Sequence, residues 1–312
     1  MMAHLTTNVR WALVGVAGVL LLATLVVWLI AATHRDKDYS ELKLRTRSWW
    51  VMIGIFAGAM LLSPLASVVF FAFVSFLALK EYLSLIPTRR ADRRVLFWAY
   101  LAIPIHYYWV ATGWYGMFII FIPVYMFLLL PLRMVIIGET EGFLRAAGTL
   151  HWGMMTTVFS LSHMAFLLVL PADKNPAGAG AGLMLYLVFL TQFNDVAQYT
   201  WGKLLGKHKV IPKVSPKKTW EGLIGGNLTT LGLAVLIAPY LTPFSLYEAA
   251  GAGLIIGVFG FIGDVTISAL KRDLGVKDSG SLLPGHGGIL DRIDSLTYTA
   301  PLFFHYVYFL HY

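Results

Sequence analysis

Long apolar runs without a charged residue place the strongest constraint on this chain. Residues 11–32 form one such run of 22 residues, and residues 49–79 form another of 31. A helix of about 20 apolar residues crosses a bilayer and satisfies its own backbone hydrogen bonds. Only 13% of the residues are charged, whereas soluble domains carry about 25%. We therefore expect an all-α, polytopic integral membrane protein.

The basic residues suggest how the chain is threaded through the membrane. Of the 24 Lys and Arg residues, 22 lie in five segments between apolar runs. The positive-inside rule places such segments in the cytoplasm. They cover residues 34–48, 80–94, 133–148, 202–221 and 271–295.

The run at residues 49–79 then joins two cytoplasmic segments and must cross the membrane twice. Pro64 lies near its middle, and proline disrupts a helix interior, so we expect a helix pair divided there. The alternative is one long tilted helix. With the pair, about nine to ten transmembrane helices are expected, with both chain ends outside. The further spans are expected at residues 96–110, 117–132, 149–170, 182–201, 222–240, 246–270 and 296–312.

Polar residues in or beside the spans collect in the last third of the chain. Placing such residues in a membrane costs free energy, so they are functional candidates by default. We therefore expect residues 1–180 to be N-terminal transmembrane helices and residues 181–312 to form the catalytic region. Because the basic segments are expected inside, the active site is expected to face the cytoplasm.

Two of the candidate clusters lie around the basic segment at 202–221. Asp195 lies within the preceding span and requires a cation or a strong donor. A helix is expected to begin near Thr219, and free N–H groups at a helix start favour an anion such as phosphate. The alternatives are a helix–helix hydrogen-bond cluster and an ordinary positive-inside loop. The candidate phosphate-binding residues are Ser215, Lys217, Lys218 and Thr219.

A third cluster lies at the end of the span at 246–270. Asp264, Ser268 and Lys271 are spaced four and three residues apart, so they share one helical face. The alternative to a catalytic role is an internal Asp–Lys pair without a ligand.

The fourth cluster follows directly in residues 277–295. Asp291 and Asp294 are three residues apart, and Gly287 and Gly288 let backbone amides approach an anion closely. Neighbouring carboxylates repel one another, and a divalent cation removes that repulsion. Carboxylates together with phosphate oxygens suit Mg²⁺, whereas the lack of Cys disfavours zinc. His286 is interpreted as a phosphate or loop hydrogen-bond partner, with metal ligation as the alternative.

The third and fourth clusters together resemble the signature of the CDP-diacylglycerol synthase (phosphatidate cytidylyltransferase) family. That signature reads S-x-x-K-R, four residues, K-D, a small residue, P-x-H-G-G and D-R-x-D. Residues 195–222 are similar to its upstream element, and Gln198 and Ile267 depart from the family pattern. The resemblance covers residues 190–300. The signature spans residues 268–294 and is filled by Ser268, Lys271, Arg272, Lys277, Asp278, Gly280, Pro284, His286, Gly287, Gly288, Asp291, Arg292 and Asp294.

The resemblance implies the reaction CTP + phosphatidate → CDP-diacylglycerol + pyrophosphate, with CTP, phosphatidate and membrane lipids as partners and no nucleic acid. It implies Mg²⁺ as cofactor, K⁺ as a second ion, and a homodimer. Asp264, Asp291 and Asp294 would hold the metal, and with Lys271 they would form the catalytic set. A bacterial inner membrane is the expected location. The implied substrate-binding residues are Asp195, Ser215, Lys217, Lys218, Thr219, Ser268, Arg272, Lys277, His286, Gly287, Gly288 and Arg292.

Other functions compete with this interpretation. A kinase or another CTP-dependent nucleotidyltransferase acting on a different membrane lipid is the main enzymatic alternative. A CDP-alcohol phosphotransferase is disfavoured because its D-G-x-x-A-R motif is absent. A transporter would need polar residues through the full membrane depth, and a membrane scaffold would need no such cluster.

Overall fold

The computed structural model describes residues 4–33, 38–89, 92–285 and 287–312. Within these ranges there is no β-strand, only two isolated bridges, Lys209–Thr219 and Leu283–Gly287. The all-α expectation is confirmed. The helices are α1 (Thr7–Thr33), α2 (Ser40–Leu62), α3 (Pro64–Leu85), α4 (Arg93–Ala111), α5 (Tyr115–Ile120), η2 (Phe121–Met126), α6 (Phe127–Ile137), α7 (Phe143–Met154), η3 (Met155–Phe159), α8 (Ser160–Leu167), η4 (Ala172–Lys174), α9 (Ala179–Leu205), α10 (Trp220–Leu241), α11 (Leu246–Asp273), α12 (Leu290–Ile293) and α13 (Leu296–His311).

The predicted helix pair at residues 49–79 is confirmed. Helix α2 ends at Leu62, Ser63 adopts an extended backbone, and Pro64 begins α3. The Ser63 hydroxyl accepts a hydrogen bond from the Ala66 N–H at 3.0 Å and so caps α3. Proline fits this first helical position because its missing N–H would have no partner there.

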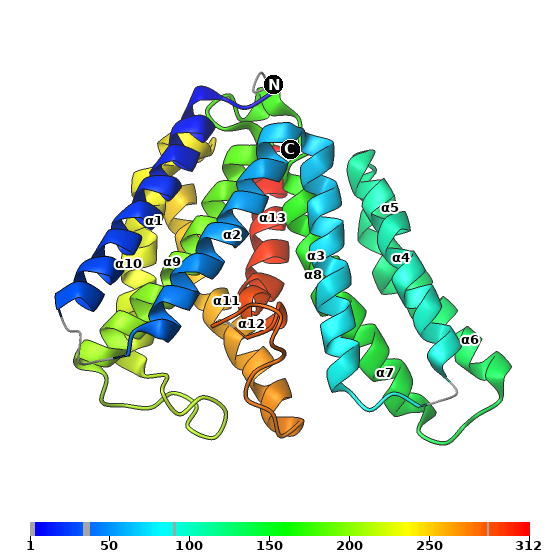
Figure 1. The fold of residues 1–312 in the computed structure, drawn as a ribbon. Helices are drawn as coiled ribbons and strands as arrows, with labels where there is room; N and C mark the ends of the chain where they lie inside the picture. Colours follow the sequence, from blue (N-terminus) through cyan, green and yellow to red (C-terminus); the bar gives the residue numbers. More distant parts are fainter. Residues whose placement is uncertain (1–3, 34–37, 90–91, 286) are drawn as a thin grey trace.

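The helices run up and down between two ends of the bundle (Figure 1). The N- and C-termini lie at one end, as the alternation of basic segments predicts. The connections α3–α4, α6–α7, α9–α10 and α11–α12 lie at the other end, which we call the basic end. Every predicted span therefore corresponds to a helix or a run of consecutive helices.

Five helical segments in the described ranges are long and apolar enough to cross a membrane by length and composition. They confirm a polytopic integral membrane protein. The remaining spans stay predictions. The five segments are Thr7–Thr33, Pro64–Leu85, Tyr115–Ile137, Trp220–Leu241 and Leu246–Asp273.

Glycines bring α9, α10 and α11 into close contact. A Cβ on Gly226 of α10 would collide with Gln198 of α9, and one on Gly257 of α11 would collide with Asn227 of α10. Membrane helices associate through such small residues and through hydrogen bonds between helices. Asn194 of α9 accepts from the Thr230 hydroxyl at 3.0 Å and donates to the Gly257 carbonyl at 3.2 Å. These three helices support the polar cluster described below.

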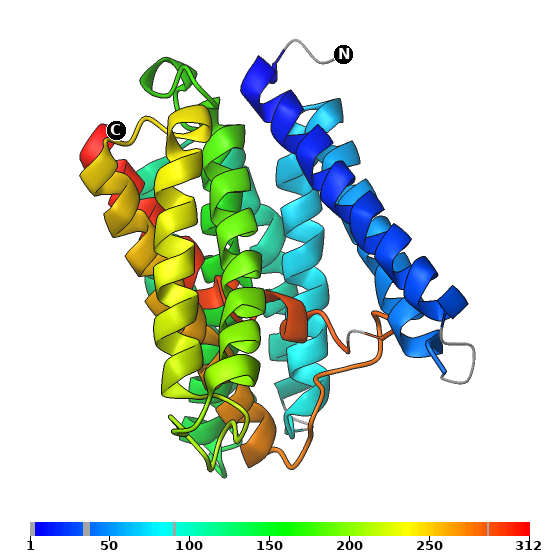
Figure 2. The same cartoon turned by 90° about the vertical axis from the view of Figure 1, so that its left-hand side faces the viewer.

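The segment after α11 turns back into the bundle (Figure 2). It rises from the basic end to the short helix α12, and α13 continues from there towards the C-terminus. The Ser48 hydroxyl of α2 donates to the Pro284 carbonyl at 2.7 Å and ties this segment to the N-terminal half. Asp291 in α12 is thereby buried, whereas Lys277 and Asp278 earlier in the signature stay exposed.

The chain lacks Cys, so single cysteines report its orientation. Thr112, between α4 and α5, lies at the end opposite the basic end, and Lys213 lies in the α9–α10 connection; both are exposed. We expect a membrane-impermeant maleimide to label Thr112→Cys in intact cells but Lys213→Cys only after permeabilisation. The reverse pattern would contradict the prediction that the basic end lies in the cytoplasm.

Candidate active site

An ion pair joins the α9–α10 connection to α11. Lys218 Nζ lies 2.6 Å from Asp264 Oδ2, and the Ser268 hydroxyl donates to Asp264 Oδ1 at 3.3 Å. Burial penalises the charge of Lys218, but the carboxylates of Asp264 and Asp195 outweigh this penalty and raise the pKa of Lys218 above its ordinary value. The two sequence clusters that contain Lys218 and Asp264 therefore meet in one site.

Two further predicted acids lie beside this pair. Asp195 of α9 accepts from the Ser295 hydroxyl at 3.1–3.2 Å, and the Ser295 N–H donates to Asp294 Oδ1 at 2.7 Å. Asp195, Asp264 and Asp294 lie close enough to act on one another electrostatically. Gly263 permits this arrangement, because a Cβ there would lie 2.5 Å from the Asp294 carbonyl oxygen. Acids from three separate segments thus converge.

Asp291 forms the second ion pair of the site. Its Oδ1 lies 2.7 Å from Lys271 Nζ, and its Oδ2 accepts from the Ser279 N–H at 2.8 Å and the Gly288 N–H at 3.0 Å, with the Ser279 hydroxyl oxygen 2.9 Å away. Burial opposes its ionisation, but Lys271 and these N–H donors outweigh that effect and lower the pKa of Asp291 below its ordinary value. Both carboxylate oxygens are therefore held by the protein.

The two glycines of the signature make room for acidic side chains. Gly287 has φ +80°, and a Cβ on it would lie 2.5 Å from Asp291 Oδ2; a Cβ on Gly288 would collide with the Glu81 carboxylate. The sequence predicts close approach of this backbone to an anion. In the structure, the anions it approaches are carboxylates of the protein itself.

Helix α10 begins at Trp220, one residue after the predicted position. Thr219 is its N-cap, and its hydroxyl accepts from the Gly222 N–H at 3.2 Å. The Thr219 hydroxyl therefore caps the helix and lies buried against Gly206.

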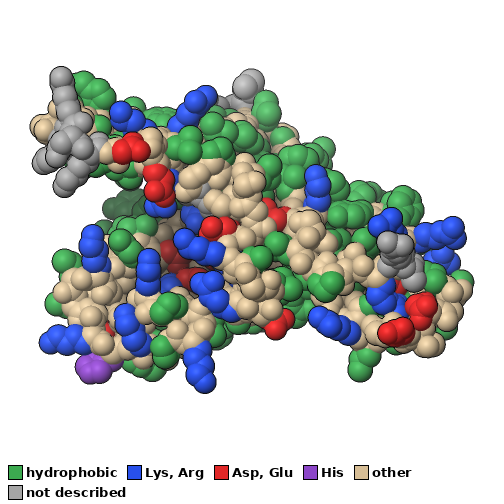
Figure 3. All heavy atoms as spheres, turned by 60° about the horizontal axis from the view of Figure 1, so that its bottom comes forward, with side chains coloured by type: hydrophobic (Ala, Val, Ile, Leu, Met, Phe, Trp, Pro, Cys, Tyr) green, Lys and Arg blue, Asp and Glu red, His purple; other side chains and the backbone are tan. Residues whose placement is uncertain are grey.

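The other predicted residues lie around this core. Ser215 is half-buried, Lys217 and Lys277 are exposed, and His286 lies outside the described residues. Arg272 donates to the carbonyls of Val214 and Val276 at 3.3 Å and joins two connections. Arg292 Nε is buried and has no hydrogen-bond partner among the described residues. Figure 3 shows Lys and Arg side chains gathered around a hollow at the basic end, with acidic side chains among them.

Metal binding stays a prediction. No group of three or more Asp, Glu or His side chains in the described part of the chain meets the arrangement that would hold an ion. Instead, Lys218 and Lys271 are the counter-cations of Asp264 and Asp291.

Glu81 is a site residue that the sequence analysis missed. It lies near the end of α3, and its carboxylate accepts from the N–H groups of Ile289 and Leu290 at 2.9 and 3.0 Å. The available signal was an acid two residues after the end of an apolar run, within a segment interpreted only as a basic topology signal. The division of the chain at residue 180 stays a prediction, but these contacts cross it.

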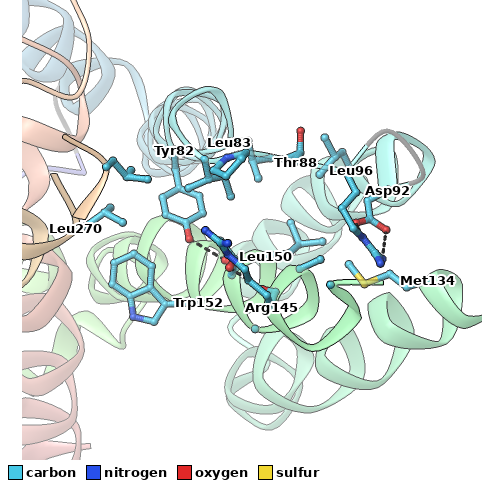
Figure 4. A pocket seen from close by; sticks show the side chains of 18 of the residues that line it. Tyr82, Leu83, Thr88, Asp92, Leu96, Met134, Arg145, Leu150, Trp152 and Leu270 are labelled. Carbon is cyan, nitrogen blue, oxygen red and sulfur yellow. Dashed lines mark hydrogen bonds and ion pairs between the residues drawn. The ribbon is translucent and has the colours of Figure 1, made fainter. Parts of the chain in front are cut away.

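A separate cavity of 850 Å³ lies on the other side of α11 (Figure 4). Thr266, Leu270 and Asp273 line it, whereas Asp264, Ser268 and Lys271 occupy the opposite helical face. Arg89 is paired with Asp92 at 2.6 Å. Acids outnumber bases in this cavity, so it does not suit a polyanion. The charged lining residues are Arg89, Asp92, Glu139, Glu141, Arg145 and Asp273.

Comparison with known proteins supplies the family. The model of the cytidylyltransferase family matches residues 43–310, which is most of the chain. The chain belongs to the cytidylyltransferase family. It is therefore a nucleotidyltransferase, which confirms the enzyme class that the signature predicts.

Individual relatives match over different lengths. Protein YnbB of Escherichia coli (strain K12), named as uncharacterized, is 46% identical over 92% of this chain and 94% of its own length. The phosphatidate cytidylyltransferase of Staphylococcus aureus (strain COL) is 44% identical over 39% of this chain and 48% of its own length. That of Haemophilus influenzae is 45% identical over 42% of this chain and 46% of its own length. The named enzymes thus match this cytidylyltransferase over about half their length.

Removing one member of the buried ion pair tests its energetic role. Lys271→Met replaces the lysine with an uncharged side chain of similar length and leaves Asp291 without its cation. Breaking a buried pair in this way costs about 3 kcal/mol or more. We expect SDS-induced unfolding in mixed micelles to report this loss.

Lys277→Met is the matched control, because Lys277 is exposed in the segment that follows. Its free energy of unfolding should change by no more than about 0.5 kcal/mol. Equal destabilisation by both substitutions would show that the Lys271–Asp291 pair has no special role.

Proposed function

We propose that this cytidylyltransferase transfers the cytidylyl group of CTP to phosphatidate and forms CDP-diacylglycerol and pyrophosphate. The convergence of signature acids and lysines at the basic end is the observation that carries this proposal. Asp264 pairs with Lys218 and Asp291 with Lys271, and these paired charges would lie where a membrane lipid and a soluble nucleotide meet. The named phosphatidate cytidylyltransferases support the choice of acceptor.

The chemistry requires little beyond positioning and charge stabilisation. A phosphate oxygen of the acceptor attacks the α-phosphorus of CTP, and the bond from this phosphorus to pyrophosphate breaks. The acceptor is already an anion, so no general base is needed. The protein must bring two polyanions together and stabilise the leaving pyrophosphate.

Mg²⁺ is the proposed cofactor, with K⁺ as a second ion. Asp264, Asp291 and Asp294 would hold Mg²⁺, and Asp195 lies beside them. The chemistry of the donor set fits, because carboxylate oxygens are the ligands that Mg²⁺ prefers, and Asp195, Asp264 and Asp294 act on one another electrostatically. When bound, the metal would neutralise phosphate charge.

The cationic side chains provide phosphate contacts. Lys218 and Lys271 each lie within 2.7 Å of a carboxylate, and each ammonium would exchange this carboxylate for a phosphate group of the substrate. Arg292 has a buried Nε without a hydrogen-bond partner among the described residues, which suits an anion. The further proposed substrate contacts are Ser215, Lys217, Thr219, Ser268, Arg272, Lys277, His286, Gly287 and Gly288.

The membrane supplies the acceptor. Its acyl chains would remain in lipid while the phosphate group enters the site from the basic end. We propose that the protein lies in a bacterial inner membrane with this end in the cytoplasm, and that it forms a homodimer.

A second candidate is transfer to, or phosphorylation of, another membrane lipid. The long match is to YnbB, whereas the named phosphatidate enzymes match only partly. Gln198 also departs from the family pattern, and it is buried against Gly226 and the Gly257 carbonyl beside Asp195.

A direct assay separates these candidates. Purified protein with CTP, Mg²⁺ and a panel of phospholipids should release pyrophosphate with phosphatidate and form a CMP-containing lipid. A kinase would release CDP instead of pyrophosphate. Turnover with another lipid and none with phosphatidate would show that the other lipid is the acceptor.

Asp291→Asn tests the site within this reaction. The substitution removes the negative charge that faces Lys271, so we expect turnover to fall on the order of 100-fold or more while membrane insertion is retained. Asp173→Asn is the control, because Asp173 is exposed in η4. Normal CMP incorporation by Asp291→Asn would contradict the assignment.

A further inference from the structure

Glu81 connects the N-terminal half of the bundle to residues 277–295, which we call the signature segment. Its Oε2 accepts from the Ile289 N–H at 2.9 Å, and its Oε1 accepts from the Leu290 N–H at 3.0 Å. The Ser279 hydroxyl donates to Oε1 at 2.5 Å. One carboxylate on α3 therefore engages three residues of the segment that contains Asp291.

The backbone contacts fall at the start of α12, which has only four residues. The first N–H groups of any helix have no partner within the helix. Buried donors without partners are costly, and hydrogen bonds to a carboxylate are among the stronger ones. Because α12 is too short to be stable alone, an external anchor decides where it lies.

Ser279 extends this contact to the candidate catalytic acid. Its hydroxyl lies 2.5 Å from Glu81 Oε1 and 2.9 Å from Asp291 Oδ2, while its N–H also donates to Asp291. Asp291 in turn pairs with Lys271. Glu81, Ser279, Asp291 and Lys271 thus form one continuous polar chain from α3 to α11.

Gly288 independently indicates that the signature segment is shaped to accommodate the Glu81 carboxylate. A Cβ at this position would collide with the Glu81 carboxylate, so the glycine leaves the space that the acid occupies. The Gly288 N–H is then free to donate to Asp291 Oδ2 at 3.0 Å.

We propose that Glu81 is a positioning residue of the active site: from α3, it holds α12 and the Gly287–Gly288 turn so that Asp291 faces Lys271. The active site then includes a residue from outside 181–312. The kinetic consequences rest on the proposed function, whereas the structural consequences do not.

Limited proteolysis tests the structural part without any substrate. Glu81→Gln preserves the size of the side chain but replaces one acceptor oxygen with an NH₂ donor that faces existing donors. We expect trypsin to cleave after Lys277 on the order of tenfold faster, because the segment opens locally more often. Cleavage after Lys213 in the α9–α10 connection should stay unchanged, which excludes general misfolding.

Glu139→Gln is the matched control for this measurement. Glu139 also lies at the basic end, in the α6–α7 connection, is exposed, and its carboxylate accepts from the Glu141 N–H at 3.0 Å. Its Lys277 cleavage rate should equal that of the original protein. Unchanged cleavage after Lys277 in Glu81→Gln would overturn the proposal.

Kinetics and a double-mutant cycle test the functional part. Glu81→Gln should lower kcat and raise KM for CTP about tenfold, with KM for the lipid acceptor unchanged. Ser279→Ala should act in the same direction, and the double variant should be no worse than the more severe single variant, since both break one chain of contacts.

The outcomes separate the two proposals. If no lipid is cytidylylated but proteolysis changes as expected, the proposed reaction fails and the positioning role stands. If Glu81→Gln has normal kcat and KM for CTP, or if the two substitutions add fully, the positioning role is overturned even when the reaction is confirmed.

Discussion

Carboxylates inside an apolar helical bundle are the constraint on which this structure depends. An isolated buried charge is costly, so each acid needs a cation or several donors. Lys218 neutralises Asp264, and Lys271 with backbone N–H groups neutralises Asp291. The partners come from other segments of the chain, so satisfying the acids determines how the helices and their connections are placed.

Close helix packing makes this arrangement possible. Gly226 and Gly257 bring α9, α10 and α11 together, and Gly263 lets α11 approach the segment after α12. Helix α11 then separates two environments. One face carries Asp264, Ser268 and Lys271. The opposite face carries Leu270 and lines the separate cavity. The polar cluster and the cavity are therefore distinct sites on one helix.

Local patterns predicted much of the architecture. Apolar length and basic segments indicated the spans, and Pro64 marked the division between α2 and α3. Helical spacing placed Asp264 and Ser268 on one face, which their hydrogen bond confirms. Spacing did not identify the partner cations: Asp264 pairs with Lys218 from another segment, and Lys271 pairs with Asp291. Local periodicity cannot predict ion pairs between residues of different segments.

The sequence by itself determined the class of protein, the alternation of helices and the family, because hydrophobic length, charge position and a dense signature are local properties. Only the tertiary structure decided that Glu81 holds the signature segment and that Gly287 and Gly288 make room for the protein's own carboxylates. The Glu81 contacts join residues about two hundred positions apart. They exist only once the bundle has excluded water and each buried acid has found its donors.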